Sequence, residues 1–200
     1  MLRIMHKITG ISLVFFLLNA CSTMAPLSTP TQQSSAERQQ SLNSLTHWHI
    51  KGKIGVQTSD DAGSATLDWQ QNHQQFTLSL MGPLGTNAIT LKGQQGQVIL
   101  TTADGKQVRA QSAEALLQEQ WGFQLPVSYI LFWIRGLPAP GTHSAITLDD
   151  HQRLRSLTQQ GWNVRFLSYT NAANRELPRQ IAITSPRLKA KIIIYTWKID

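Results

Sequence analysis

Apolar and polar residues alternate along most of the chain beyond residue 47. The first example is Trp48, Ile50, Ile54 and Val56, which are separated by polar or small residues. Alternation with period two is typical of a β-strand that has one dry and one solvated face. The pattern returns at 65–69, 76–80, 89–91, 98–100, 162–166, 181–183 and 188–194. The chain is therefore predicted to be mainly β.

The connections between these segments are short and contain turn residues. Asp104-Gly105 is the strongest hairpin signal among them. Short connections favour antiparallel neighbours, so we expect a meander of ten or eleven strands. A sheet of that size with one apolar face has to curl or close to hide it.

Three segments without alternation are predicted to be short helices. The first spans 37–45. The second begins after Ser112, a good cap, and runs to 121 with Gly122 at its end. The third has Pro126 in its first position and ends before Gly136. Its residues 127–134 are apolar almost all round but too few to span a bilayer. We expect the last two helices to cross the open end or inner face of the sheet, with most of their side chains filling the core.

One turn carries an apolar residue at its tip. Met81-Gly82-Pro83-Leu84-Gly85 connects two predicted strands, and Leu84 occupies the tip. A leucine at this position is either folded back into the core, the more usual outcome, or presented to another surface.

The N-terminus predicts an export signal. Arg3 and Lys7 precede a mostly apolar run over 8–18, which is too short for a membrane span but typical of a signal peptide. Leu18-Asn19-Ala20-Cys21 then resembles the lipobox of bacterial lipoproteins, in which the cysteine is acylated and becomes the first residue. We therefore expect a signal peptide over 1–20, an acylated flexible tether over 21–35 and a single domain over 36–200. Ser22 is not Asp, which implies export to the outer membrane in such lipoproteins.

Charge and missing motifs narrow the function. The net charge is +7, and removal of Arg3 and Lys7 with the signal leaves +5. Because the basic residues are scattered, a nucleic-acid partner is not expected. The positive net charge instead predicts a basic rim on the domain that attracts a more acidic protein partner. Signatures of nucleotide, zinc-protease, redox and hydrolase sites are missing from the sequence, so it does not predict an enzyme. His47 and His49 share a strand face without nearby further ligands, which favours a solvated strand over a metal site.

Several short motifs, in this order, resemble the LolB family of outer-membrane lipoproteins. They lie at 48–55, 69–71, 82–85, 125–126, 133–138, 160–162 and 177–178. The resemblance implies an incomplete antiparallel β-barrel of about eleven strands, lidded by short α-helices, that encloses an apolar cavity for acyl chains. It also implies that Pro83, Leu84 and Gly85 protrude as a membrane-insertion loop.

The function that the resemblance implies is transfer of lipoproteins without nucleotide. The chain would take acylated lipoproteins from a LolA-like periplasmic carrier and insert them into the outer membrane. It would be a monomer on the periplasmic leaflet, with no metal or cofactor beyond the N-acyl and S-diacylglycerol groups on Cys21.

The alternation supplies candidate residues for the cavity. Its predicted lining is Ile54, Val56, Leu67, Trp69, Leu78, Leu80, Ile89, Leu91, Ile130, Leu131 and Trp133. A shift of one residue would exchange the two strand faces, so the alternation alone leaves the inward face open. Two other functions also stay open: a scaffold lipoprotein of an outer-membrane assembly machine, which predicts a solid core, and a lipoprotein that binds small lipids.

Overall fold

A computed structural model describes residues 34–94, 96–121 and 125–199. All of them belong to the second of two compact units, Met1–Thr31 and Gln32–Asp200. The signal peptide, Cys21 and nearly all of the expected tether lie outside the described residues, as does Gly122.

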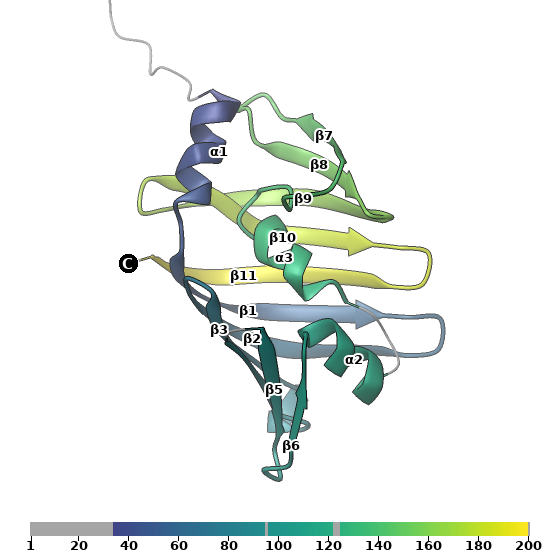
Figure 1. The fold of residues 1–200 in the computed structure, drawn as a ribbon. Coiled ribbons are helices and arrows are strands. Elements are labelled where there is room, and N and C mark those ends of the chain that lie inside the picture. Colours follow the sequence, from purple (N-terminus) through teal and green to yellow (C-terminus); the bar gives the residue numbers. More distant parts are fainter. Residues whose placement is uncertain (1–33, 95, 122–124, 200) are drawn as a thin grey trace, which may run out of the picture. The chain divides into compact units, whose positions relative to one another are not determined.

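Eleven antiparallel strands form one sheet in the order β6-β5-β4-β3-β2-β1-β11-β10-β9-β8-β7 (Figure 1). The strands are β1 His47–Gln57, β2 Ala62–Asn72, β3 Gln75–Met81, β4 Ile89–Gln94, β5 Gln97–Thr102, β6 Gln107–Ala110, β7 Ser144–Leu148, β8 Leu154–Gln159, β9 Trp162–Ala172, β10 Arg175–Thr184 and β11 Lys189–Ile199. Because the order ends at β6 and β7, the sheet is open. The predicted fold, a mainly β, incomplete antiparallel barrel, is confirmed.

Two meanders make up this sheet, and they join where the first strand pairs with the last. The pairing of β1 with β11 shifts register between Lys51 and Gly52. A Cβ atom at Gly52 would lie 2.1 Å from the carbonyl oxygen of Ile193, so only glycine allows the strands to approach this closely. Such a bulge increases the local bend of the sheet.

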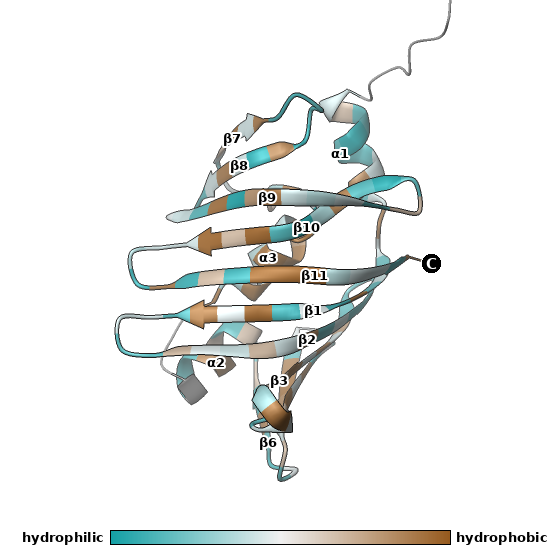
Figure 2. Cartoon of the chain, turned by 180° about the vertical axis from the view of Figure 1, so that it is seen from behind, coloured by the Kyte–Doolittle hydropathy of each residue, from teal (hydrophilic) through white to brown (hydrophobic). Residues whose placement is uncertain are grey.

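The predicted alternation places one row of apolar side chains across the first meander. Ile50, Trp69, Leu78, Leu91 and Leu100 are register partners from β1 through β5, and all five are buried. Figure 2 shows the same alternation as brown and teal segments along β1, β10 and β11. The row gives the sheet a continuous apolar face.

Three α-helices and one 3₁₀ turn, η1, accompany the sheet. Their bounds are α1 Ser35–Asn43, η1 Pro83–Gly85, α2 Ala113–Trp121 and α3 Val127–Trp133. Both α2 and α3 lie over the same face of the sheet, and the view from behind agrees (Figures 1 and 2). Among the described residues, no helix is long and apolar enough to cross a membrane.

Capping residues explain where the helices begin. Ser34 and Glu37 form a reciprocal capping box, so α1 starts two residues before the predicted position. The hydroxyl of Ser112 accepts a hydrogen bond from the Ala115 backbone, as its predicted role requires. The prediction for Pro126 was wrong by one position: it is the N-cap of α3, with ψ of 75°, and the helix begins at Val127.

Candidate functional site

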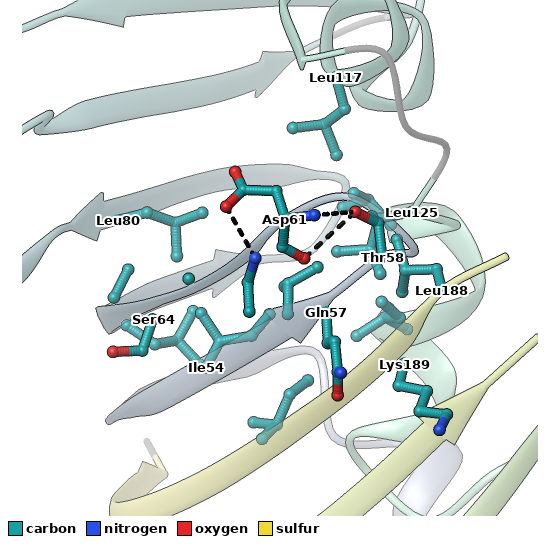
Figure 3. A pocket seen from close by; sticks show the side chains of 18 of the residues that line it. Ile54, Gln57, Thr58, Asp61, Ser64, Leu80, Leu117, Leu125, Leu188 and Lys189 are labelled. Atoms are coloured by element: carbon teal, nitrogen blue, oxygen red, sulfur yellow. Dashed lines mark hydrogen bonds between the residues drawn. The ribbon is translucent and has the colours of Figure 1, made fainter.

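An open cavity of about 1800 Å³ lies between the apolar face of the sheet and the two helices over it. Its walls come from β1 to β4 and β11, with Leu117 of α2 and Val127 and Ile130 of α3 on the helical side. Figure 3 shows Leu117, Leu125 and Leu188 around one part of this cavity, with Ile54 and Leu80 on the strands. The volume exceeds the roughly 300–1,000 Å³ of an ordinary small-molecule pocket, and the walls are apolar.

Nine of the eleven residues predicted for the cavity line it. They are Ile54, Val56, Leu67, Trp69, Leu78, Leu80, Ile89, Leu91 and Ile130. The inward strand face is therefore the one that carries the predicted residues.

Leu131 and Trp133 are not among the residues that line the cavity. Trp133 is fully buried, and its indole Nε1 donates a hydrogen bond of 2.9 Å to the side-chain oxygen of Gln159. Leu131 packs against the core. Only one face of a buried helix points towards a neighbouring cavity. Ile130 lies on that face of α3.

The cavity also includes apolar residues that were not predicted for it. The larger ones are Leu117, Leu125, Val127, Trp162, Leu188 and Ile192. The last three stand in segments of recognised alternation, so a pattern signal existed for them. Their place in the cavity depends on the pairing of β11 with β1 and on helix packing, neither of which the local pattern contains.

Loops from three strand pairs form the rim of the cavity at one end of the sheet. They contribute residues 57–62 between β1 and β2, Gly82, Pro83 and Asn87 between β3 and β4, and residues 185–189 between β10 and β11. Asp60 and Asp61 stand in the first loop and Arg187 and Lys189 at the third, so the rim carries both signs of charge rather than the expected basic surplus.

Hydrogen bonds hold the first of these loops in shape (Figure 3). Thr58 donates from its backbone N, at 2.8 Å, and from its hydroxyl, at 3.2 Å, to the carbonyl of Asp61. The Asp61 carboxylate accepts a hydrogen bond of 2.7 Å from the Ala62 backbone. The polar groups of this loop are thus engaged within it, and the apolar walls begin directly below.

The loop after β3 presents a leucine to solvent. Leu84 has a relative exposure of 103% and left-handed backbone angles, φ 57° and ψ 22°. Non-glycine residues adopt this region at a cost of about 1–2 kcal/mol. Strain of this kind is found at functional sites, where the surrounding structure enforces it.

Backbone hydrogen bonds enforce the shape of this loop. Gly82 donates to the carbonyl of Thr86 at 2.8 Å, and the hydroxyl of Thr86 donates to the carbonyl of Pro83 at 2.8 Å. A Cβ atom at Gly82 would lie 2.8 Å from the Thr86 carbonyl oxygen, so glycine is required for this closure. Leu84 is therefore held outward by its own loop.

The end of α3 is fixed by a buried arginine. Arg135 donates to the carbonyl of Leu45 at 3.0 Å and to that of Leu131 at 3.1 Å, and its guanidinium lies 5.0 Å from the Phe132 ring centre. Burial lowers the pKa of this guanidinium from its ordinary value, and no carboxylate pairs with it among the described residues. It bonds instead to carbonyl oxygens, which ties α3 to the junction of α1 and β1.

The two histidines of β1 have local partners. Nε2 of His49 lies 2.9 Å from a carboxylate oxygen of Asp68, and the ring of His47 packs edge-on against His73 at 4.1 Å. Across residues 34–94, 96–121 and 125–199, no group of three or more His, Cys, Asp or Glu is arranged to hold a metal.

The open antiparallel sheet with its covering helices is a fold shared with solved structures of very different sequence. A DUF1329 family protein from Desulfovibrio piger matches with a TM-score of 0.54 and 6% identity over 83% of this chain and 90% of its own. An outer membrane lipoprotein-sorting domain from Vibrio parahaemolyticus matches with a TM-score of 0.52 and 8% identity over 83% and 91%. At these identities the likeness shows the fold alone, that of an open antiparallel sheet covered by helices.

Sequence relatives define the family within this fold. The family described as outer membrane lipoprotein LolB matches residues 46–197. The outer-membrane lipoprotein LolB of Pseudomonas putida (strain GB-1) is 43% identical over 84% of this chain and 81% of its own length. That of Pseudomonas aeruginosa (strain LESB58) is 37% identical over 91% of each. The chain belongs to the LolB family.

Membership of this family confirms three predictions. The chain is an outer-membrane lipoprotein, its role lies in lipoprotein localisation, and it is not an enzyme. The acylation of Cys21 and the roles of individual residues stay predictions.

Proposed function

We propose that the domain accepts the acyl chains of lipoproteins in the 1800 Å³ cavity and releases them to the outer membrane beside the Leu84 loop. The supporting observation is that cavity and loop share one end of the sheet: Gly82 and Pro83 belong both to the loop and to the cavity rim. A chain leaving the cavity would therefore emerge beside an exposed leucine.

Transfer in this arrangement requires only a gradient of affinity. The cavity must hold an acyl chain more tightly than the carrier does and less tightly than the bilayer. Each tenfold step corresponds to about 1.4 kcal/mol, and burying one methylene contributes about 0.8 kcal/mol. A difference of about two buried methylenes between two sites therefore changes the affinity about tenfold. Because the cavity is open, it buries a chain less completely than a bilayer does.

The partners follow from this mechanism. The donor is a LolA-like periplasmic carrier, the cargo is an acylated lipoprotein, and the recipient is outer-membrane lipid. Acyl groups on Cys21 would keep the domain near that lipid, because stable anchoring takes two or more chains.

The test uses the full-length chain in vesicles and a carrier preloaded with an acylated lipoprotein, without nucleotide. Cargo is expected to appear first on the chain and then in the vesicles. Leu80→Glu, on the cavity wall, is expected to lower capture at least tenfold, whereas Ser79→Glu, on the neighbouring outward position, keeps it. Equal capture by the two variants would contradict the proposal. Retention of free fatty acid with no movement of cargo would favour a small-lipid-binding protein.

A further inference from the structure

A second, smaller concavity of about 290 Å³ lies on the opposite face of the sheet, next to the Leu84 loop. Lys53, Thr66 and Met81 are register partners on β1, β2 and β3, and they form one side of it. Leu84 and Tyr195 complete its border. This outer concavity adjoins the acyl cavity at Ser64, Ala65, Gly82 and Pro83, which border both, but the inward side chains line only the acyl cavity.

Exposed apolar residues gather at the outer concavity. Five large apolar side chains of the described residues are markedly exposed, and three of them, Met81, Leu84 and Tyr195, border it. Tyr195 is 63% exposed, and it continues the outward set of β11, which alternates with the buried Ala190, Ile192 and Ile194. It also lies at the register shift between β1 and β11, where Lys51 pairs with Thr196 and Gly52 with Ile194.

Three lysines lie on the same face of the sheet as this apolar group. Lys53 borders the outer concavity, and Lys51 and Lys191 occupy exposed positions of β1 and β11. The carboxylate of Asp68 on β2 is engaged, by His49 at 2.9 Å and Lys51 at 3.5 Å. Within the part of the chain that the structure describes, Lys53 and Lys191 form no ion pair. Their positive charge is therefore free to bind an anion outside the protein.

This combination of groups fits the surface of an anionic membrane. The interfacial region of a bilayer offers a matching place for each of these groups. Apolar side chains enter the acyl region, aromatic rings stay at its boundary, and lysines bind the lipid phosphates. The expected acylated residue, Cys21, precedes Ser34 by thirteen positions, so the tether spans at most about 45 Å. The bilayer is thus the partner that the domain meets continuously.

We propose that the outer concavity is a docking site for anionic phospholipid. Leu84 enters the acyl region, Met81 and Tyr195 lie at its boundary, and Lys53 and Lys191 bind phosphate groups. Because the acyl cavity meets the outer concavity only along one part of its rim, the remainder of the cavity stays open to a carrier while the domain is docked. The biological role of docking rests on the proposed function, but docking itself is measurable without cargo.

The test places a spin label at Thr66, which borders the outer concavity, through Thr66→Cys in the full-length, lipid-anchored chain. Cys21 is the only native cysteine, and acylation would block it. The matched control is Thr158→Cys, an exposed position on the same face of β8. Accessibility of each label to oxygen and to a water-soluble relaxation agent is compared in phosphatidylethanolamine vesicles with and without phosphatidylglycerol.

With phosphatidylglycerol, the label at Thr66 is expected to gain oxygen contact and lose contact with the aqueous agent, while the label at Thr158 remains aqueous. Lys53→Glu is expected to lower the docked-to-free ratio about 25-fold, since each surface cation contributes about a fivefold factor and the reversal counts twice. Lys198→Glu changes the net charge equally at an exposed position near the other end of β11, where it pairs with His49, and is expected to have little effect.

Three results would overturn the inference: equal behaviour of the two labels, no dependence on phosphatidylglycerol, or protection of the Thr66 label only when carrier is added. The last would assign the surface to the carrier. Movement of cargo is measured on the same vesicles. A docked domain that moves no cargo contradicts the proposed function alone, and cargo movement without docking contradicts only this inference.

Discussion

Two apolar segments interrupt the strands of this protein, and they end in opposite environments. The loop at Pro83–Gly85 holds Leu84 fully in solvent, in a strained backbone conformation. Helix α3 buries Trp133 completely and ties its end to carbonyl oxygens through Arg135. Apolar character alone therefore does not decide which segment is buried. The loop is closed by its own backbone hydrogen bonds, whereas α3 is held by polar groups from distant elements.

The largest expected difference between the two segments concerns stability. Trp133→Ala is expected to lower the free energy of unfolding by about 3–5 kcal/mol, because it leaves a cavity and removes the partner of Gln159. Leu84→Ala is expected to change it by less than about 0.5 kcal/mol, because the side chain buries nothing. Urea denaturation measures both. Similar losses in the two variants would show that the loop is part of the folded core.

The buried arginine tests what holds α3. Arg135→Met keeps most of the apolar stem but leaves the carbonyl of Leu45 without its donor. We expect a loss of about 2–3 kcal/mol, typical for hydrogen bonds to a charged group, with faster amide exchange in α3. If stability is unchanged, packing alone holds the helix.

Delivery of cargo tests what the exposed leucine does. Leu84→Glu is expected to lower transfer from the chain into vesicles at least tenfold, since insertion loses about 1.5–3 kcal/mol of apolar burial. Capture from the carrier and stability should stay unchanged. The control is Ile146→Glu, an exposed apolar position on β7. A loss of delivery in the control as well would mean that added negative charge is responsible.

The smallest expected effect is the change in stability when the strained backbone of Leu84 is relieved, and it distinguishes backbone strain from the role of the side chain. Leu84→Gly relieves about 1–2 kcal/mol of left-handed strain but gives the unfolded chain about 0.5–1 kcal/mol of additional entropy. We expect a net gain of about 0.5 kcal/mol in stability together with lost delivery. Leu84→Ala keeps the strain and should not gain stability. A stabilised variant that still delivers cargo would show that the leucine is not needed.

Local patterns explain how much of this molecule the sequence predicts. Alternation depends only on neighbouring residues, so it predicted β1–β5 and β9–β11 and showed which residues of each share a face, such as Leu78 and Leu80. It named no segment for β6, β7 or β8 and left open which face points inward. The bulge at Gly52 and the pairing of β1 with β11 join residues that are far apart in sequence, and no local signal contains them.

In the candidate site, too, local sequence patterns do not reveal contacts between distant residues. The exclusion of Trp133 from the cavity depends on Gln159, a distant partner on β8. Composition alone favoured a buried Leu84, and only the resemblance to the family predicted that it protrudes. Its exposure follows from the hydrogen bonds between Gly82, Pro83 and Thr86, which the order of residue types does not reveal.

One measurement tests the central claim most directly. A photoreactive residue is placed at Leu78, on the cavity wall, in the full-length chain in vesicles, and a second at Thr158 on the outward face serves as control. A carrier loaded with an acylated lipoprotein is added without nucleotide. The account predicts a crosslink from position 78 to the acyl part of the cargo, which fades as cargo enters the vesicles, and none from position 158. Cargo that reaches the vesicles without ever crosslinking at position 78 would contradict it.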